Sequence, residues 1–149
     1  MEPWANSWDL PSNLYNDSLI EDPTVETDRD YNQLLSSYCM NKAANAKTKL
    51  RFTYTPVHGV GTRAVKAAMK VFSLPDLIEV PLQKDPHPDF PTVKFPNPEE
   101  GAGVLELAME AAEAEGCTHI LASDPDADRL AVAEKKNGKW RVFTGNELG

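Results

Sequence analysis

The sequence predicts an α/β domain with three α/β/α layers, a mixed, mostly parallel sheet and an antiparallel hairpin at one edge. Between residues 49 and 143, short runs rich in β-forming residues alternate with helical patterns, which is typical of parallel strands joined by crossover helices. The last two runs are instead separated by Asn137-Gly138, a dipeptide typical of tight hairpins, so the sheet is expected to end in antiparallel strands.

A helix and a strand are predicted before residue 56. Apolar residues repeat at i, i+3, i+4 and i+7 between residues 28 and 44, which predicts a helix there with Thr27 or Asp28 as its cap. The repeating residues are Tyr31, Leu34, Leu35 and Tyr38. The run 50–55 is rich in β-branched and aromatic residues and ends at Pro56, which predicts a strand.

Two helices and a short strand are predicted next. Residues 62–72 carry apolar side chains on one helical face, and residues 77–80 read as a short strand. Six of the twelve prolines lie in residues 81–98, which predicts an extended loop of a length that is usually functional. Residues 101–115 are rich in Ala, Leu and Glu and predict a helix that Gly116 ends.

Three strands complete the predicted sheet. Residues 118–123 are apolar on both faces, as expected of a central parallel strand. Residues 130–134 and 139–143 are the two arms of the hairpin, and Trp140 and Phe143 are expected to be core aromatics.

Charge and composition limit the function. The net charge is −8, and residues 1–31 hold eight acidic residues against one basic residue, a net of −7, so the other residues total −1. The sequence has no basic patch for nucleic acid and no run approaching the roughly 20 apolar residues that span a bilayer. Cys39 and Cys117 have no metal-ligand spacing, so free thiols are expected. Without a secretory signal in the sequence, we expect a cytoplasmic protein with neither nucleic acid nor membrane as partner.

The segment Asp124-Pro-Asp-Ala-Asp-Arg129 carries the main chemical signal. Three carboxylates spaced by two residues after a buried strand can converge on one hard cation. The adjacent Arg129 suits a bidentate contact with a phosphate, and a metal that shares a phosphate oxygen is most often Mg²⁺. Asp124, Asp126 and Asp128 are therefore the predicted Mg²⁺ ligands, and Arg129 is the predicted phosphate-binding residue.

A polar turn without a metal is the alternative reading of this segment. A calcium EF-hand is excluded because, counted from Asp124, the sixth residue is Arg129 where Gly is required and the twelfth is Lys135 where Glu is required. A haloacid-dehalogenase-like phosphatase is disfavoured because Asp128 stands in the fifth place, where that pattern needs Thr or Val.

The turn at residues 56–61 is a weaker candidate. It follows a strand and opens a helix with two glycines, an arrangement that lets backbone N–H groups approach a phosphate. His58 lies where α/β sheets place their ligands and is a candidate phosphate- or substrate-binding residue. A structural histidine in a tight turn is the alternative. The proline-rich loop could be a lid or an inter-domain contact, but we favour the interpretation in which Asn97 and Glu99 cap the following helix.

Together these segments resemble the α-D-phosphohexomutases, in the branch that contains phosphoglucomutase-2, phosphopentomutases and glucose-1,6-bisphosphate synthases. The resemblance covers essentially the whole chain, and the aspartate segment and the Gly-Asn-Glu-Leu-Gly end are its specific parts. The matching segments are residues 2–9, 56–61, 83–85, 95–100, 124–134 and 142–149.

The resemblance implies phosphoryl transfer between C1 and the terminal hydroxyl of a hexose or pentose, through an enzyme phosphoserine and a sugar bisphosphate. Asp124, Asp126 and Asp128 would hold Mg²⁺, and Arg129 would lie beside the phosphoserine phosphate. The substrate would be a glucose, ribose or deoxyribose phosphate or glucose 1,6-bisphosphate, and hexose, pentose and bisphosphate-synthase specificity stay open.

Several parts of the family pattern are missing. The sequence has no Thr-Ala-Ser-His-Asn-Pro-type phosphoserine loop and no sugar-selecting loop, so no catalytic residue is assigned and the chain alone is expected to be inactive. We expect residues 1–48 to be an acidic lead and connecting helix from a first domain, 49–143 the metal-binding domain, and 144–149 the start of a third. The other domains of the parent chain would then be its partners. A non-catalytic metal-binding or interaction module is the alternative.

Overall fold

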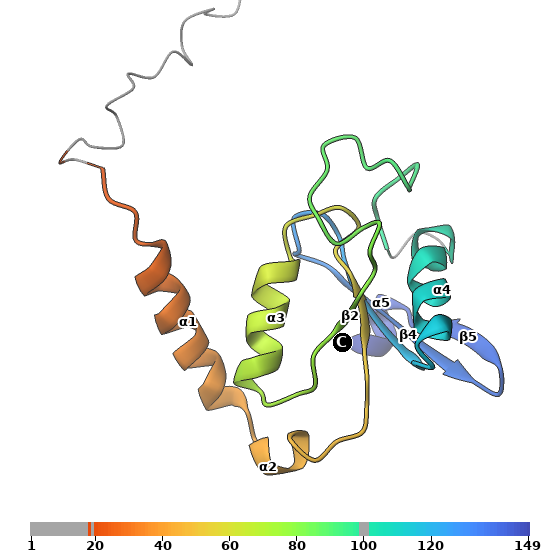
Figure 1. Cartoon of the computed structure of the whole chain (residues 1–149), viewed down its shortest axis with the longest axis horizontal. Coiled ribbons are helices and arrows are strands. Elements are labelled where there is room, and N and C mark those ends of the chain that lie inside the picture. The colour runs from red at the N-terminus through yellow and green to blue at the C-terminus, as the bar shows by residue number, and fades with distance from the viewer. Residues whose placement is uncertain (1–17, 19, 99–101) are drawn as a thin grey trace, which may run out of the picture.

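The computed structural model describes residues 18, 20–98 and 102–149 (Figure 1). Their five strands form one sheet in the order β2-β1-β3-β4-β5. β1 pairs in parallel with β2 and β3, and β4 pairs antiparallel with β3 and β5. The strands are β1 (Thr53–Thr55), β2 (Ile78–Glu79), β3 (His119–Ser123), β4 (Leu130–Lys136) and β5 (Lys139–Val142). The predicted mixed sheet with an antiparallel edge is confirmed.

Two helices cover opposite faces of the sheet. α3 (Thr62–Val71) joins β1 to β2, and α4 (Glu106–Ala114), preceded by the 3₁₀ turn η2 (Ala102–Leu105), joins β2 to β3. Because β1 lies between β2 and β3, the two crossovers run in opposite directions, and right-handed crossovers of opposite direction place their helices on opposite faces. Figure 1 shows α3 and α4 on the two sides of the sheet, which confirms the three-layer arrangement.

The hydrophobic core lies between α4 and the sheet, where α4 packs on β1, β2 and β3. Small alanines of α4 face alanines of β3 and β4, so the helix approaches the sheet closely. The buried core residues are Val80, Leu105, Ala108, Ala112, Cys117, Ile120, Ala122, Ala131 and Ala133. Trp140 is half-buried against this core, whereas Phe143 is half-buried beside the Arg141 guanidinium, so only Trp140 matches the predicted core role.

The edge hairpin has the turn that the sequence predicts. Asn137 and Gly138 have φ angles of 52° and 77°, both in the left-handed region. Two consecutive residues of this kind are what a type I′ turn requires, and its twist matches that of the flanking strands. The turn therefore sets the register in which Glu134 lies opposite Arg141.

The first predicted helix is two helices. α1 (Thr24–Tyr38) begins after Pro23 rather than at Thr27 or Asp28, and Asp22 accepts a hydrogen bond from the Thr24 N–H at 3.0 Å. It ends at Tyr38, and Asn41 caps α2 (Lys42–Asn45) by accepting from the Ala44 N–H. The Asn45 side chain donates to the Phe72 carbonyl at 2.8 Å, which holds α2 against the end of α3.

The structure differs from the prediction at other places too. β1 starts at Thr53 rather than at residue 50 because its pairing with both neighbouring strands begins at Thr53, opposite Ile78 of β2 and Ile120 of β3. The predicted helix over 101–115 begins as a 3₁₀ turn, and residues 99–101 lie outside the described part of the chain, including Glu99 of the predicted cap. α5 (Gly145–Leu148) was not predicted, and a capping box between Thr144 and Glu147 opens it.

One buried hydroxyl lacks a hydrogen-bond partner among the described residues. It is the Oγ1 of Thr53, whose residue is fully buried. No helix in the described ranges is both long and apolar enough to cross a membrane.

Candidate metal centre

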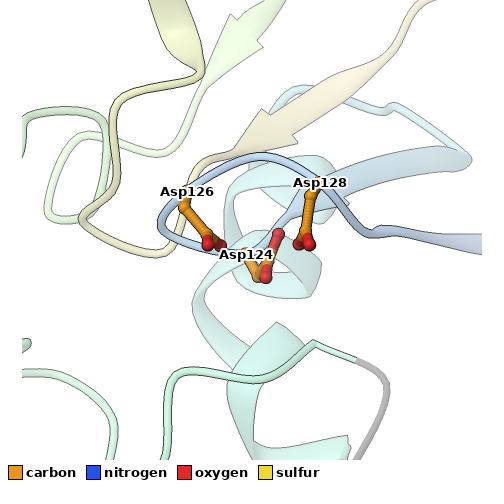
Figure 2. Close-up of side chains that lie close together, drawn as sticks. All are labelled: Asp124, Asp126 and Asp128. Carbon is orange, nitrogen blue, oxygen red and sulfur yellow. The ribbon is translucent and has the colours of Figure 1, made fainter.

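The aspartate loop, residues 124–129, follows β3 and leads into β4. Asp124, Asp126 and Asp128 point their carboxylates toward one another (Figure 2), and one oxygen from each lies within 4.8 Å of the other two. Asp124 is buried, whereas the other two aspartates are exposed. The structure therefore brings the three predicted carboxylates together at the carboxyl end of a parallel strand, with one open side.

The backbone of the loop explains the convergence. Ala127, between the last two aspartates, has a φ of 63°, in the left-handed region that residues other than glycine rarely adopt. Its N–H donates to the Asp124 carbonyl at 3.0 Å, which closes a tight turn. This turn brings Asp126 and Asp128 back over Asp124.

Asp124 and Arg129 form the most buried ion pair of the site. The backbone N–H of Arg129 donates to Asp124 Oδ1 at 3.0 Å, and its Nε donates to Oδ2 at 2.8 Å. Burial of Asp124 opposes its ionisation, but the backbone and side-chain hydrogen bonds from Arg129, together with contacts to Asp126 and Asp128, outweigh burial and lower the pKa of Asp124. Asp124 is therefore a carboxylate at neutral pH.

The pKa of Asp128 shifts in the opposite direction. Its contact with Asp124, followed by the negative charges of Asp126 and Asp124, raises the pKa of Asp128. The three carboxylates thus repel one another, and a cation between them would relieve that repulsion. Clustered carboxylate oxygens suit hard divalent cations such as Mg²⁺ and Ca²⁺, so this donor set fits the predicted ion.

The histidine loop, residues 56–61, lies directly against the aspartate loop. The Val60 N–H donates to the Pro125 carbonyl at 2.9 Å. A Cβ added to Gly59 would lie 2.2 Å from Pro125 Cα, a separation that only glycine allows. The two predicted loops therefore meet through their backbones.

His58 itself does not join the carboxylates. It is 4% exposed, and its Nε2 forms a 2.8 Å hydrogen bond with the Thr92 hydroxyl. Burial lowers the pKa of His58, and the neighbouring His87 lowers it further, so the imidazole is neutral at neutral pH. His58 also lines a shallow pocket of about 260 Å³ that His87, Phe90 and Pro125 share.

The histidine loop is strained and held by a buried polar network. Val57 and His58 have φ angles of 49° and 61°, in the left-handed region that residues other than glycine rarely adopt. Val57 is also β-branched, which makes this conformation still less favourable. The Gln83 carbonyl accepts from the His58 N–H at 3.0 Å, and the Gln83 side chain accepts from the Thr55 hydroxyl and donates to Thr92. Sequence reasoning did not identify Thr55 or Thr92, because their partners lie 28 and 34 residues away.

The fold and the aspartate loop define the class of the protein as an α/β/α domain of the phosphosugar mutase type. Residues 29–138 match the family model described as phosphoglucomutase/phosphomannomutase, alpha/beta/alpha domain II, and the chain belongs to this family.

Relatives of this chain are phosphomutases and related enzymes. It is 50% identical to "Phosphopentomutase" of Homo sapiens over 100% of the chain and 24% of that protein. It is 52% identical to "Glucose 1,6-bisphosphate synthase" of Homo sapiens over 99% of the chain and 24% of that protein. It is 38% identical to "Phosphoribomutase" of Saccharomyces cerevisiae over 100% of the chain and 26% of that protein. The chain thus spans about a quarter of the length of these relatives.

Proposed function

We propose that this chain is the magnesium-binding domain of a phosphosugar mutase that moves a phosphoryl group between C1 and the terminal hydroxyl of a hexose or pentose. The reaction would proceed through an enzyme phosphoserine supplied by another part of the protein and a sugar bisphosphate. The observation that carries the proposal is the convergence of three carboxylate oxygens within 4.8 Å in the loop that ends with Arg129. Relatives named as phosphopentomutase and glucose 1,6-bisphosphate synthase support this substrate class.

Asp124, Asp126 and Asp128 would hold the Mg²⁺ ion. When bound, the ion supplies Lewis-acid stabilisation of the charge that develops on a transferring phosphoryl group. Each carboxylate oxygen has two lone pairs, so Asp124 can keep both hydrogen bonds from Arg129 and still offer a lone pair to the cation. Arg129 would thereby orient the buried ligand.

Arg129 would also lie beside the phosphate. Its side chain is 43% exposed although its Nε is bonded to Asp124, so part of this side chain stays accessible to a ligand. His58 stays in the proposal as the second phosphate- or substrate-binding residue because it lines the pocket beside Pro125. Its neutral imidazole would act there as a hydrogen-bonding group rather than as a cation.

The proposed domain organisation follows from the same family. Residues 1–48 would be the tail of a first domain with its connecting helix, 49–143 the metal-binding domain, and 144–149 the start of a third. The coverage of about a quarter of each relative supports this arrangement. We also propose a cytoplasmic location. Cys39 and Cys117 are free thiols, which is typical of a reducing compartment and supports this location.

A magnesium titration followed by amide NMR tests the metal site. We expect shifts confined to residues 124–129 and the adjoining histidine loop, because the ion would contact only the three aspartates. Asp126→Asn removes one charged ligand and is expected to weaken binding at least about tenfold, since loss of even a ligand's supporting group costs 10- to 100-fold in affinity.

Asp89→Asn is the matched control, because Asp89 is an exposed aspartate in the proline-rich segment, outside the aspartate loop. It should titrate like the wild type. A flat titration of the folded wild-type chain, or equal shifts in Asp126→Asn, would favour the alternative in which the aspartates form only a polar turn.

The purified chain is expected to lack phosphomutase activity on its own. The purified chain should not interconvert glucose 1-phosphate and glucose 6-phosphate, nor the corresponding ribose phosphates, because its sequence holds no phosphoserine loop to carry the transferred group. The assay is ³¹P NMR with Mg²⁺ and added glucose 1,6-bisphosphate. Conversion by pure chain, abolished in Asp126→Asn, would overturn the assignment of the nucleophile to another domain.

A further inference from the structure

Two hydroxyl groups meet beneath the aspartate loop. Tyr54 belongs to β1, and Ser123 is the last residue of β3, directly before Asp124. Their side-chain oxygens are 2.7 Å apart, and either hydroxyl can donate. Tyr54 is 1% exposed and Ser123 6%, so water does not compete for this hydrogen bond. The bond ties the strand end that presents Asp124 to the neighbouring strand.

The hydroxyl groups of Tyr54 and Ser123 also lie next to the apex of the aspartate loop. A Cβ built on Gly61 would lie 2.5 Å from the Tyr54 hydroxyl oxygen, 2.9 Å from Ser123 Oγ and 3.2 Å from Ala127 Cβ. Three side chains therefore surround the point that Gly61 leaves open. Ala127 is the residue with left-handed backbone between Asp126 and Asp128. The hydroxyl pair and Gly61 thus adjoin the loop at both its start and its apex.

We propose that Tyr54 and Ser123 are positioning residues for the metal centre, and that their hydrogen bond holds the aspartate loop in the conformation in which its three carboxylates converge. Neither residue contributes a ligand. The inference rests on the proposed metal function and adds residues that the aspartate segment does not contain. Tyr54 and Ser123 are 69 positions apart in the sequence, so their hydrogen bond is seen only in the folded structure.

Tyr54→Phe removes one oxygen and leaves the ring in place, so it tests the hydrogen bond alone. We expect the dissociation constant for Mn²⁺, measured by electron paramagnetic resonance, to rise about three- to tenfold, the range that the loss of one hydrogen bond gives. In the metal-free chain, the amides of Ala127 and Arg129 should exchange with solvent faster, because both donate to Asp124. Adding Ser123→Ala should weaken binding no further, since both changes remove the same bond.

Thr53→Val is the matched control. Thr53 is the preceding residue of β1, fully buried, and its hydroxyl has no hydrogen-bond partner among the described residues. Its replacement should leave both the Mn²⁺ affinity and the exchange of the loop amides unchanged. A general loosening of β1 would instead affect both variants alike.

The outcomes separate this inference from the proposed function. If the wild type binds Mn²⁺ and Tyr54→Phe binds it equally tightly with wild-type amide exchange, the positioning role is wrong and the metal site stands. If the wild type and Asp126→Asn both fail to bind Mn²⁺, the metal function is wrong and the positioning role is overturned with it. Equal losses of Mn²⁺ affinity in Tyr54→Phe and Thr53→Val would also overturn the positioning role.

Discussion

Arg129→Ala is expected to lower the free energy of unfolding of the metal-free chain by about 3 kcal/mol at pH 7, because it leaves a buried carboxylate without its cationic partner. The Asp124 side chain is 0% exposed, and it loses the 2.8 Å hydrogen bond from the guanidinium. The backbone N–H of residue 129 still donates to Asp124, and Arg129 is 43% exposed, so we take the lower end of the range for buried pairs. Urea unfolding in the presence of a chelator measures this difference.

The effect of Arg129→Ala should depend on pH with a definite sign. In the wild type the folded-state pKa of Asp124 is lowered, so its stabilising contribution is complete above the unfolded value of about 3.9 and is lost as pH falls through the folded value. In the variant, the guanidinium hydrogen bond that lowers the folded pKa of Asp124 is lost while the burial that raises it remains, so this pKa is higher than in the wild type and ionisation of Asp124 stabilises the fold less. The difference between the two proteins should therefore be largest near neutrality and shrink toward pH 4, as protonation removes the buried charge.

Arg141→Ala provides the comparison. Arg141 pairs with Glu147, and both side chains are substantially exposed, at 63% and 40%. Such surface pairs contribute between about 0 and 1 kcal/mol, so this variant should differ little from the wild type at any pH. If Arg129→Ala changed stability no more than Arg141→Ala, the Asp124–Arg129 pair would contribute nothing beyond an ordinary surface contact.

The sequence predicts well those features whose cause is local. Asn137-Gly138 predicts its hairpin because a type I′ turn demands left-handed backbone at both positions, and both residues adopt it. The convergence of the three aspartates is predicted from their spacing and from the strand before them, and the structure brings their oxygens within 4.8 Å. In both cases the sequence signal comes from neighbouring residues.

The sequence predicts poorly those features that distant contacts decide. The position of α2 depends on Asn45 binding the Phe72 carbonyl, 27 residues away, and no helical periodicity contains that information. The sequence likewise does not show that the His58 imidazole is bonded to the Thr92 hydroxyl, 34 residues away, and the ligand-binding role of His58 stays a prediction. Polar residues near a site thus acquire their partners only when the chain is folded.

Gly59→Ala should have an effect comparable with that of Arg129→Ala, through packing rather than charge. The added Cβ would lie 2.2 Å from Pro125 Cα and 2.3 Å from the Pro125 carbonyl oxygen. Both obstacles are backbone atoms, so no side-chain rotation relieves the overlap and the two loops must separate. We expect the free energy of unfolding to fall by about 3 kcal/mol, the upper end for overpacking of a well-packed site.

Gly59→Ala should also weaken metal binding, and this separates it from a general loss of stability. Moving the loops apart breaks the 2.9 Å hydrogen bond from the Val60 N–H to the Pro125 carbonyl, and Pro125 lies between two of the aspartates. Magnesium should therefore shift the amides of residues 124–129 only at higher concentration than in the wild type, under conditions in which the variant is still folded.

Gly103→Ala is the control that isolates the contact with Pro125. A Cβ at Gly103 would have only Glu106 Oε1 near it, at 3.9 Å, an ordinary van der Waals distance. That change should leave metal binding intact and alter the free energy of unfolding by no more than about 1 kcal/mol, in the stabilising direction. If Gly59→Ala behaved like Gly103→Ala, the backbone contact between the two loops would not be what holds the aspartate loop. The support would then have to come from the hydroxyl pair of Tyr54 and Ser123 alone.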